Sequence, residues 1–510
     1  MSVSSNRVIR NTGYLFFRLV VTMFMSLWVT RIVLKTLGVS DFGLYNTIGW
    51  AIGMLGFISE SMSSVTQRYM SYYQGAGDER RCFEIYNVSL IIHFVLAIIL
   101  VIALVVAGVI FFSGLLNIPE GRMFAAKIIY VAMTISTAFT LMTVPYEAII
   151  TAHENMFFFA VEGIIRSCVK LIVACSVLYI DGDKLVVYGI LLSIVSILDM
   201  LILRYYCHIT YKECVFSPSH YWNNSIAIEM TKFASWNFFK SVSAFITNYG
   251  SVLVLNHFFG VILNAAAGIA SQFGGCLQTF SSSMKKALDP SITKSEGEGN
   301  REKMLKYSSS GCKFTFATFA ILAIPIYIEM PFVLHLWLGQ YPAWSVIFSR
   351  MILVWTLISI LTLPYEQALL SEGHISNFSL VTSIINVLPL VVLVFMFMNG
   401  FPPITMYILN ILLLGVVQSI IRVVFAHKKC GLSYKSFLSD VLNPIIITML
   451  ASLLVSIIPY LFMEESYIRL LLTLFVSTVS YSTLFWLYVI DEDERTVINY
   501  AFSKIVNRFL

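Results

Sequence analysis

Fourteen apolar stretches, each about 20 residues long, dominate the sequence and decide what the chain can fold into. A bilayer core about 30 Å thick requires roughly 20 apolar residues of helix to cross it. The stretches lie near residues 13–34, 43–66, 87–112, 124–150, 157–179, 185–203, 233–255, 260–284, 308–334, 344–370, 377–398, 403–426, 441–462 and 469–490. Only 12% of the residues are charged, against roughly 25% in soluble domains, so the chain could not cover itself with polar surface in water. The sequence therefore predicts an all-α, polytopic integral membrane protein and excludes a soluble enzyme.

The basic residues give the predicted orientation, because cytoplasmic loops carry an excess of Lys and Arg. If both termini are cytoplasmic, 20 of the 33 Lys and Arg residues fall in cytoplasmic segments. Only four fall in outer loops, namely Lys35, Arg122, Lys184 and Arg469. We therefore expect both termini on the cytoplasmic side, and the short outer loops exclude an outer catalytic domain.

The residue types and their spacing argue against several classes of function. The eight cysteines form no CxxC pair, no two histidines have metal-ligand spacing, and no nucleophile stands beside a base. A net charge of +5 is too weak and too scattered for a nucleic-acid binder. The sequence therefore predicts no cofactor, no metal, no nucleic-acid partner and no enzymatic activity.

An internal repeat is the strongest signal in the chain. A shift of 222 residues aligns Phe16-Phe17-Arg18 with Phe238-Phe239-Lys240 and Gly38-Val39 with Gly260-Val261. A shift of 219 aligns Thr143-x-Pro145-Tyr146-Glu147 with Thr362-x-Pro364-Tyr365-Glu366. Matches in the same order at nearly constant spacing predict two copies of a six-span unit.

The repeat predicts the domain organisation. Six spans are an even number, so the two copies have the same orientation and are related by a pseudo-twofold axis along the membrane normal. We expect one lobe over residues 1–212, a second over 213–430, and two further spans with a cytoplasmic tail over 431–510. Two lobes around a central cavity are typical of a transporter that works by alternating access.

The start of the chain resembles a known family. The segment Leu37-Gly38-Val39-Ser40-Asp41-Phe42-Gly43-Leu44-Tyr45, together with the two lobes and two extra spans, resembles the multidrug/oligosaccharidyl-lipid/polysaccharide (MOP) flippase superfamily, and most of all its polysaccharide-transport branch. The second copy departs from this segment, with Asn264 and Ala265 at the positions of Phe42 and Gly43. The resemblance implies a flippase in the bacterial inner membrane that moves undecaprenyl-pyrophosphate-linked oligosaccharides for O-antigen, capsule or exopolysaccharide synthesis. It also implies membrane lipid and polysaccharide-assembly proteins as partners.

Basic side chains inside the spans are the candidates for substrate binding, because charges there are expensive and usually face a cavity or a partner. They are Arg18, Arg31, Arg166, Lys170 and Lys240. Glu162, Arg166 and Lys170 form a stripe on one helix face, while Arg18 and Lys240 match in the repeat and could hold a pyrophosphate. The alternatives are an internal Glu162–Arg166 pair, snorkelling of Arg18 to the interface, and Arg31 as an interfacial anchor.

Acidic side chains are the candidates for ion coupling or gating. They are Glu60, Glu147, Glu162, Asp199 and Glu366. Glu147 and Glu366 each follow a proline by two residues, where a kink could act as a hinge, although pairing with basic residues at the interface is the alternative. Asp199 and Glu60 are the better candidates to bind a coupling H+ or Na+.

Cations in the cavity favour an anionic substrate, and hence the flippase. A cation-coupled multidrug exporter of the same superfamily is the closest alternative, and a membrane-embedded glycan polymerase or ligase is a weaker one.

Overall fold

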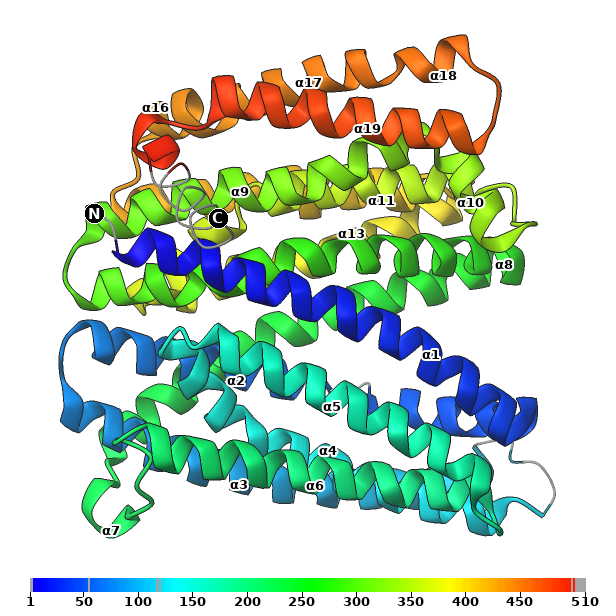
Figure 1. Ribbon diagram of the computed structural model, residues 1–510, viewed down its shortest axis with the longest axis vertical. Coiled ribbons are helices and arrows are strands. Elements are labelled where there is room, and N and C mark those ends of the chain that lie inside the picture. The colour runs from blue at the N-terminus through cyan, green and yellow to red at the C-terminus, as the bar shows by residue number, and fades with distance from the viewer. Residues whose placement is uncertain (1–2, 54–55, 116–117, 119–120, 497–498, 500–510) are drawn as a thin grey trace, which may run out of the picture. The chain divides into compact units, whose positions relative to one another are not determined.

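The protein is all-helical in the residues that the structure, a computed structural model, describes: 3–53, 56–115, 118, 121–496 and 499 (Figure 1). These residues contain no β-strand, as the sequence predicts. They fall into two compact units, one of residues 13–238 and the other of residues 1–12 with 239–510. Both divisions of the chain lie within helices. The lobe boundaries expected from the sequence remain a prediction.

The unit of residues 13–238 holds most of α1 and the helices up to the start of α8. Within it, α4 packs along α6, and both α2 and α3 pack against α4. Its helices are α1 (Val3–Gly53), α2 (Gly56–Gly75), α3 (Glu79–Ile110, with a π-turn over Phe111–Leu115), α4 (Met123–Ala152), α5 (Met156–Ser176, with a 3-10 turn over Val177–Tyr179), α6 (Lys184–Thr210) and α7 (Pro218–Tyr221).

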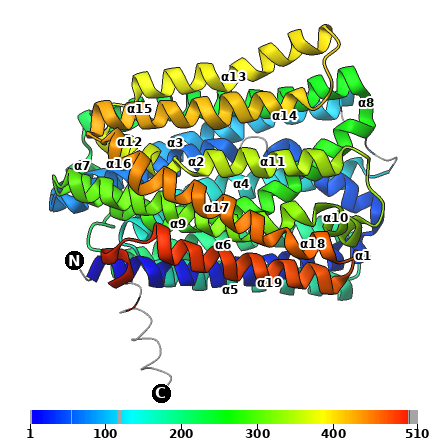
Figure 2. The same cartoon turned by 90° about the horizontal axis from the view of Figure 1, so that it is seen from above.

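The other unit begins within α8 (Asn224–Gly297). In it α9 packs against α11, α12 and α19, and α13 runs beside α14 and α15 (Figure 2). Its further helices are α9 (Arg301–Ile328), α10 (Met330–Leu338), α11 (Ser345–Ile360), α12 (Leu363–Glu372), α13 (Ser376–Met398), α14 (Thr405–Leu409), α15 (Gln418–Cys430), α16 (Tyr434–Ser436), α17 (Asn443–Ser456), α18 (Ile458–Phe462) and α19 (Tyr467–Leu484). Three π-helical segments, Asn410–Val417, Phe437–Leu442 and Phe485–Val489, lie beside α14, α16 and α19.

Eleven helices in the described residues are long and apolar enough to cross a membrane. The three other predicted spans differ for reasons visible in the sequence. Span 43–66 contains residues 54–55, which lie outside the described part. Span 157–179 is the helix α5 but carries three charges, and span 260–284 is helical within α8 but rich in small and polar residues. The chain is a multi-pass membrane protein.

The repeat is visible in the backbone at two matching glycines. Gly38 interrupts α1 with φ 78° and ψ 168°, and Gly260 interrupts α8 with φ 78° and ψ −175°. This region of backbone space is open essentially to glycine alone, because any Cβ would clash with the chain. Since the two residues are 222 positions apart, each copy of the repeat turns between its first two spans at the same residue.

The following turn repeats as well. Gly77 and Gly299 have φ of 71° and 72°. The next residue in each copy caps a helix: the side chain of Asp78 accepts from the Arg81 amide, and that of Asn300 accepts from the Lys303 amide, both at 3.0 Å. Polar side chains at this position satisfy amides that the first helical turn leaves free. The shift of 222 found in the sequence therefore marks the same local structure in both copies.

Replacing Gly260 by alanine should destabilise the protein by about 1–3 kcal/mol, because alanine is strained in this conformation. The control is Gly268→Ala, in the helical part of α8. Apart from the adjoining backbone, a Cβ would meet no atom within 4 Å at either position, so the two substitutions differ in backbone strain and not in packing against other parts of the protein. Gly268→Ala should be neutral or slightly stabilising, since alanine favours helix by up to about 1 kcal/mol over glycine. Equal apparent melting temperatures of the two variants in detergent would contradict the prediction.

The repeated proline acts differently in the two copies. Pro145 lies inside α4, which continues without interruption through Glu147. At the matching place the helix ends at Ile360, and α12 begins anew at Leu363 with Pro364 in its first turn. Proline fits the first turn of a helix because its missing N–H would be unpaired there anyway. The helix is therefore interrupted at this proline only in the second copy, and the hinge remains a prediction in both.

The last two spans form a hairpin of α17 and α19 (orange and red in Figure 1) that is held to α9 by ion pairs. Arg469 at the start of α19 pairs with Glu329, which directly follows α9, at 2.7 Å. Lys313 within α9 pairs with Glu494 beyond α19 at 3.1 Å. Arg469, Glu329, Lys313 and Glu494 are all buried, so both pairs are sheltered from water.

Candidate functional site

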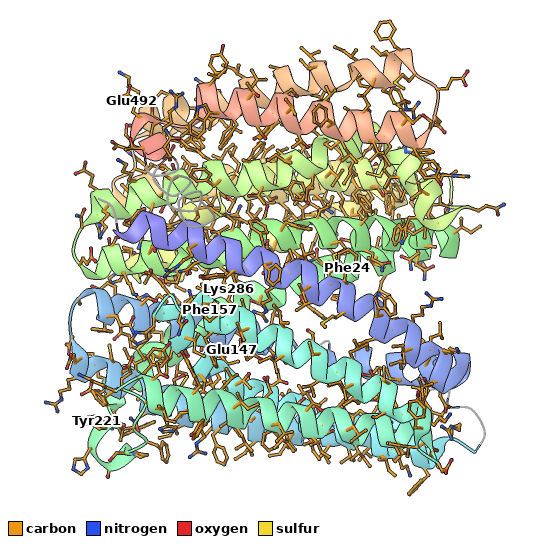
Figure 3. The ribbon with its side chains drawn as sticks, viewed as in Figure 1. Phe24, Glu147, Phe157, Tyr221, Lys286 and Glu492 are labelled. Atoms are coloured by element: carbon orange, nitrogen blue, oxygen red, sulfur yellow. The ribbon has the colours of Figure 1, made fainter. Side chains whose placement is uncertain are left out.

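Arg166 on α5 is the centre of a charged cluster in the unit of residues 13–238. Its Nε lies 2.9 Å from Oε1 of Glu162 on the same helix. Its Nη1 lies 3.1 Å from Oδ2 of Asp199 on α6, and its Nη2 lies 3.7 Å from Oε1 of Glu147 on α4. Glu147 is labelled among these helices in Figure 3. One guanidinium thus draws three carboxylates from three helices together.

Arg18 on α1 completes this cluster. Its guanidinium stacks on the ring of Phe159 on α5, 4.1 Å from the centroid. It rests directly on Gly163, where a Cβ would lie 2.1 Å from Nε of Arg18. We call Arg18, Glu147, Glu162, Arg166 and Asp199 the N-terminal charge cluster.

Gly163 is a site residue that the sequence analysis missed. Only a residue without a side chain leaves room for the Arg18 guanidinium on α5. The one signal in the sequence was a glycine on the same helix as three charges, which could have indicated that another helix approaches closely there. The side chain of Arg18 packs against α5, so the structure describes a contact that the sequence analysis did not consider.

Glu366 on α12 is the centre of a second cluster, in the other unit. It lies between Lys240 on α8, with which it forms a close ion pair, and Arg422 on α15, whose Nε donates to Oε2 of Glu366 at 2.7 Å. Glu366 and Arg422 are buried. We call Lys240, Glu366 and Arg422 the C-terminal cation centre. It holds two cations and one carboxylate, whereas the N-terminal charge cluster holds two cations and three carboxylates.

A polar chain extends the C-terminal cation centre across three helices. The Arg422 guanidinium donates to Oε1 of Gln418 at 3.2 Å, and Nε2 of Gln418 donates to Oδ1 of Asn386 on α13 at 2.6 Å. Nδ2 of Asn386 donates in turn to the hydroxyl of Ser243 on α8 at 3.1 Å. Hydrogen bonding of this kind compensates the cost of burying polar groups among apolar helices.

The repeat relates the two clusters but places their cations differently. Glu147 and Glu366 match at a shift of 219. Arg166 on α5 has Asn386 as its counterpart at a shift of 220, and the cation beside Glu366 comes from α15 instead. Arg422 was therefore missed by the sequence analysis, although a single arginine inside the apolar span 403–426 was a visible signal.

Lys170, Arg31 and Glu60 are the remaining predicted site residues. Lys170 and Arg31 are exposed, and no ion pair within the described residues involves either of them. Glu60 belongs to α2, but its side chain lies outside the described part. Among the residues that the structure describes, no group of three or more His, Cys, Asp and Glu side chains is arranged to hold a metal ion.

A third cluster joins the first ends of α4 and α6 to Asp41 of the motif near the start of the chain. Arg122 donates to Asp41 through Nε at 2.8 Å and to Asp183 through Nη1 at 2.7 Å. Burial alone would raise the pKa of Asp183, but the hydrogen bonds from Arg122 and from the amides of Val186 and Leu185 together outweigh it and hold that pKa below its ordinary value. Bidentate arginine contacts of this kind fix geometry as well as charge.

Replacing Arg122 by glutamine should therefore lower stability in a pH-dependent way. A carboxylate with a lowered pKa in the folded state stabilises the fold above its unfolded pKa of about 3.9, and this contribution is lost as the pH falls below that value. We expect a loss of about 0.2–1 kcal/mol at pH 7 that shrinks below about pH 4. Lys127→Gln, an exposed charge in the first turns of the same helix, is the control. Apparent melting temperatures between neutral and acidic pH test this, and a difference that does not change with pH would contradict it.

Known proteins resemble this chain in sequence and in fold. No protein-family model matches the chain. A curated relative, the uncharacterized membrane protein EpsK of Bacillus subtilis (strain 168), is 19% identical over 499 residues, which are 95% of each chain.

Three solved structures each match 84% of this chain over 96% of their own length. A MATE in the straight conformation has a TM-score of 0.71 at 13% identity. An outward-facing multidrug resistance MATE family transporter of the MOP superfamily has a TM-score of 0.70 at 13% identity. A MOP superfamily transporter from Pyrococcus furiosus, whose binding pocket is described as having reverse polarity, has a TM-score of 0.66 at 12% identity. The chain therefore has the fold of these transporters, which agrees with the fold expected from the sequence.

Proposed function

We propose that this protein is a flippase that moves an undecaprenyl-pyrophosphate-linked oligosaccharide across the bacterial cytoplasmic membrane, with both termini cytoplasmic. The transporter fold supports movement of a substrate by alternating access between two repeats. The product would serve the synthesis of a cell-surface polysaccharide such as O-antigen, capsule or exopolysaccharide. Polysaccharide-assembly proteins would supply and consume the lipid-linked chain.

The C-terminal cation centre is the observation that carries this proposal. Its surplus positive charge lies within the spans, where one uncompensated charge costs up to about 2.5–3.5 kcal/mol at the centre of the membrane. An anion bound there would offset that cost. A diphosphate offers several oxygens, which the planar guanidinium of Arg422 and the ammonium of Lys240 could bind together.

The N-terminal charge cluster has the opposite balance and suits ion coupling or gating. Glu147, Glu162 and Asp199 share one close cation, Arg166, so one of the carboxylates could exchange Arg166 for H+ or Na+. In this proposal Arg18 and Arg166 control these carboxylates, while Lys240 binds the substrate head group. Lys170 and Arg31, which are exposed, remain candidates for contact with the substrate.

A cation-coupled multidrug exporter is the second candidate, and the N-terminal charge cluster favours it. An excess of carboxylates over cations attracts cationic substrates, whereas the C-terminal cation centre repels them. The two candidates therefore differ in which cluster contacts the substrate.

The sidedness of lipid-linked oligosaccharide in inverted and right-side-out membrane vesicles tests the proposal. We expect the intermediate to accumulate on the cytoplasmic face when the gene is deleted, and Lys240→Gln or Arg422→Gln to restore transport poorly. Either substitution leaves Glu366 with one cation, so the fold should persist. Lys435→Gln, an exposed lysine at α16, is the matched control and should restore transport fully. Unchanged sidedness after deletion would reject the flippase, and drug efflux would then be measured.

A further inference from the structure

An apolar groove runs between α8 and α13 in the unit that contains the C-terminal cation centre. It has a volume of about 400 Å³, within the range of roughly 300–1,000 Å³ that is usual for ligand sites. Its lining comes from α8 positions three and four residues apart, and from such positions on α13. The residues are Phe239, Val242, Ser243 and Ile246 of α8, and Ser383, Ile384, Val387, Leu388 and Val391 of α13.

Polar contacts join the two helices beside the groove. The Thr247 hydroxyl donates to the Asn386 carbonyl at 2.5 Å, and Asn386 also contacts Ser243. One turn further along α8, Gly250 lets the helices approach so closely that a Cβ would lie 2.7 Å from a methyl group of Leu390. The helices are therefore pinned together beside the groove, and Ile384 and Val391 remain exposed along its wall.

The position that matches Ser383 is occupied by another side chain in the other repeat. At a shift of 220, Ser383 corresponds to Gly163, and Lys240 corresponds to Arg18 at a shift of 222. In the first copy the Arg18 guanidinium lies on Gly163 and takes up the space between α1 and α5. In the second copy Lys240 instead reaches Glu366, and the space between α8 and α13 stays open.

The groove adjoins the surplus positive charge. Phe239 of its lining directly precedes Lys240, and the chain Ser243–Asn386–Gln418–Arg422 links its floor to the C-terminal cation centre. An apolar channel next to a cationic site complements a molecule with an anionic head and a long hydrocarbon tail. Both helices lie within candidate membrane spans, so the groove lies at the depth of the hydrocarbon core.

We infer that the groove between α8 and α13 binds the polyprenyl chain of the transported lipid while its diphosphate lies at Lys240 and Arg422. This inference rests on the proposed function and assigns the tail a place of its own in the second repeat. Because the tail leaves lipid and not water, its affinity for the groove comes from van der Waals packing against the lining side chains. The tail would thus help to select a polyprenyl diphosphate over a short, water-soluble diphosphate.

Binding to the purified full-length protein in nanodiscs tests the inference with two probes, undecaprenyl diphosphate and isopentenyl diphosphate. The variant Val387→Trp fills the groove, and Leu380→Trp, an exposed position on the same helix outside the lining, is the control. We expect Val387→Trp to raise the Kd for undecaprenyl diphosphate at least roughly tenfold and to leave that for isopentenyl diphosphate unchanged, whereas Leu380→Trp should change neither. If Val387→Trp does not fold, Ile384→Trp applies the same test from the exposed wall.

Three results would overturn the inference: normal binding of undecaprenyl diphosphate by the groove-filling variant, equal weakening by Leu380→Trp, or displacement of the probe by an equal amount of phosphatidylglycerol. The last result would assign the groove to an ordinary membrane lipid. Failure of the proposed function is distinguishable, because it appears in the vesicle assay. If sidedness depends on the gene while Val387→Trp binds normally, only the groove assignment is wrong. If Val387→Trp weakens binding but sidedness does not depend on the gene, the groove binds the lipid and the flippase proposal is wrong.

Discussion

Replacement of Arg166 by glutamine should destabilise the protein by about 3–5 kcal/mol, enough to remove most of the folded protein from the membrane. The guanidinium is the shared partner of Glu147, Glu162 and Asp199, at distances of 2.9–3.7 Å. Without it, three carboxylates remain inside the spans, where an uncompensated charge is strongly unfavourable. Folded protein is measured by size-exclusion chromatography of a fluorescent fusion and by the apparent melting temperature in detergent.

The matched control is Lys170→Gln, one turn further along α5. Lys170 is exposed and, within the described residues, belongs to no ion pair, so its loss should change stability by less than about 0.5 kcal/mol. A second variant, Arg166→Gln with Asp199→Asn, removes one cation and one carboxylate together and should recover part of the lost stability. If Arg166→Gln and Lys170→Gln behave alike, Arg166 does not hold the cluster together.

This result would also separate stability from transport. Arg166→Lys keeps the positive charge but loses the planar group that reaches three carboxylates at once. We expect folded protein at a reduced level with impaired transport, because a single ammonium group cannot reproduce the contacts to α4, α5 and α6. Normal transport by this variant would limit the role of Arg166 to its charge.

The spans and the repeat could be predicted from the sequence because both depend on local properties. Hydropathy and length define a membrane helix without reference to the rest of the fold. Gly38 and Gly260 were matched from the alignment of the copies alone, and the structure gives them the same backbone conformation. The charged stripe of α5 was visible for the same reason, since spacing along one helix fixes which residues share a face.

The partners of the charges could not be predicted, because they come from other helices. Symmetry of the repeat would place the partner of Glu366 on α13, yet Asn386 stands there and Arg422 on α15 supplies the cation. The contact of Arg18 with α5 depends on Gly163, whose meaning appears only when α1 is packed beside it. Tertiary packing therefore decided the balance of charge in each cluster.

The appended hairpin provides the other large expected effect: Arg469→Met should cost about 3–5 kcal/mol. Three contacts of 2.7–3.2 Å join the Arg469 guanidinium to the carboxylate of Glu329, which has no exposed surface. Methionine leaves that carboxylate with the Thr473 hydroxyl, at 3.1 Å, as the one remaining hydrogen-bond donor from α19. Unfolding in mixtures of SDS and a mild detergent measures the loss.

The double variant Arg469→Met with Glu329→Leu decides why the pair is there. Two buried charges replaced by apolar side chains of similar size often leave stability unchanged, because the cost of removing both charges from water disappears with their attraction. We therefore expect the free energy of unfolding of the double variant to lie within about 1 kcal/mol of that of the original protein and far above that of the single variant. Recovery would mean that the pair specifies where α19 meets the end of α9 and adds little net stability. If the double variant is as unstable as Arg469→Met alone, the arginine acts through contacts other than Glu329, such as its stacking on Tyr460 at 4.8 Å.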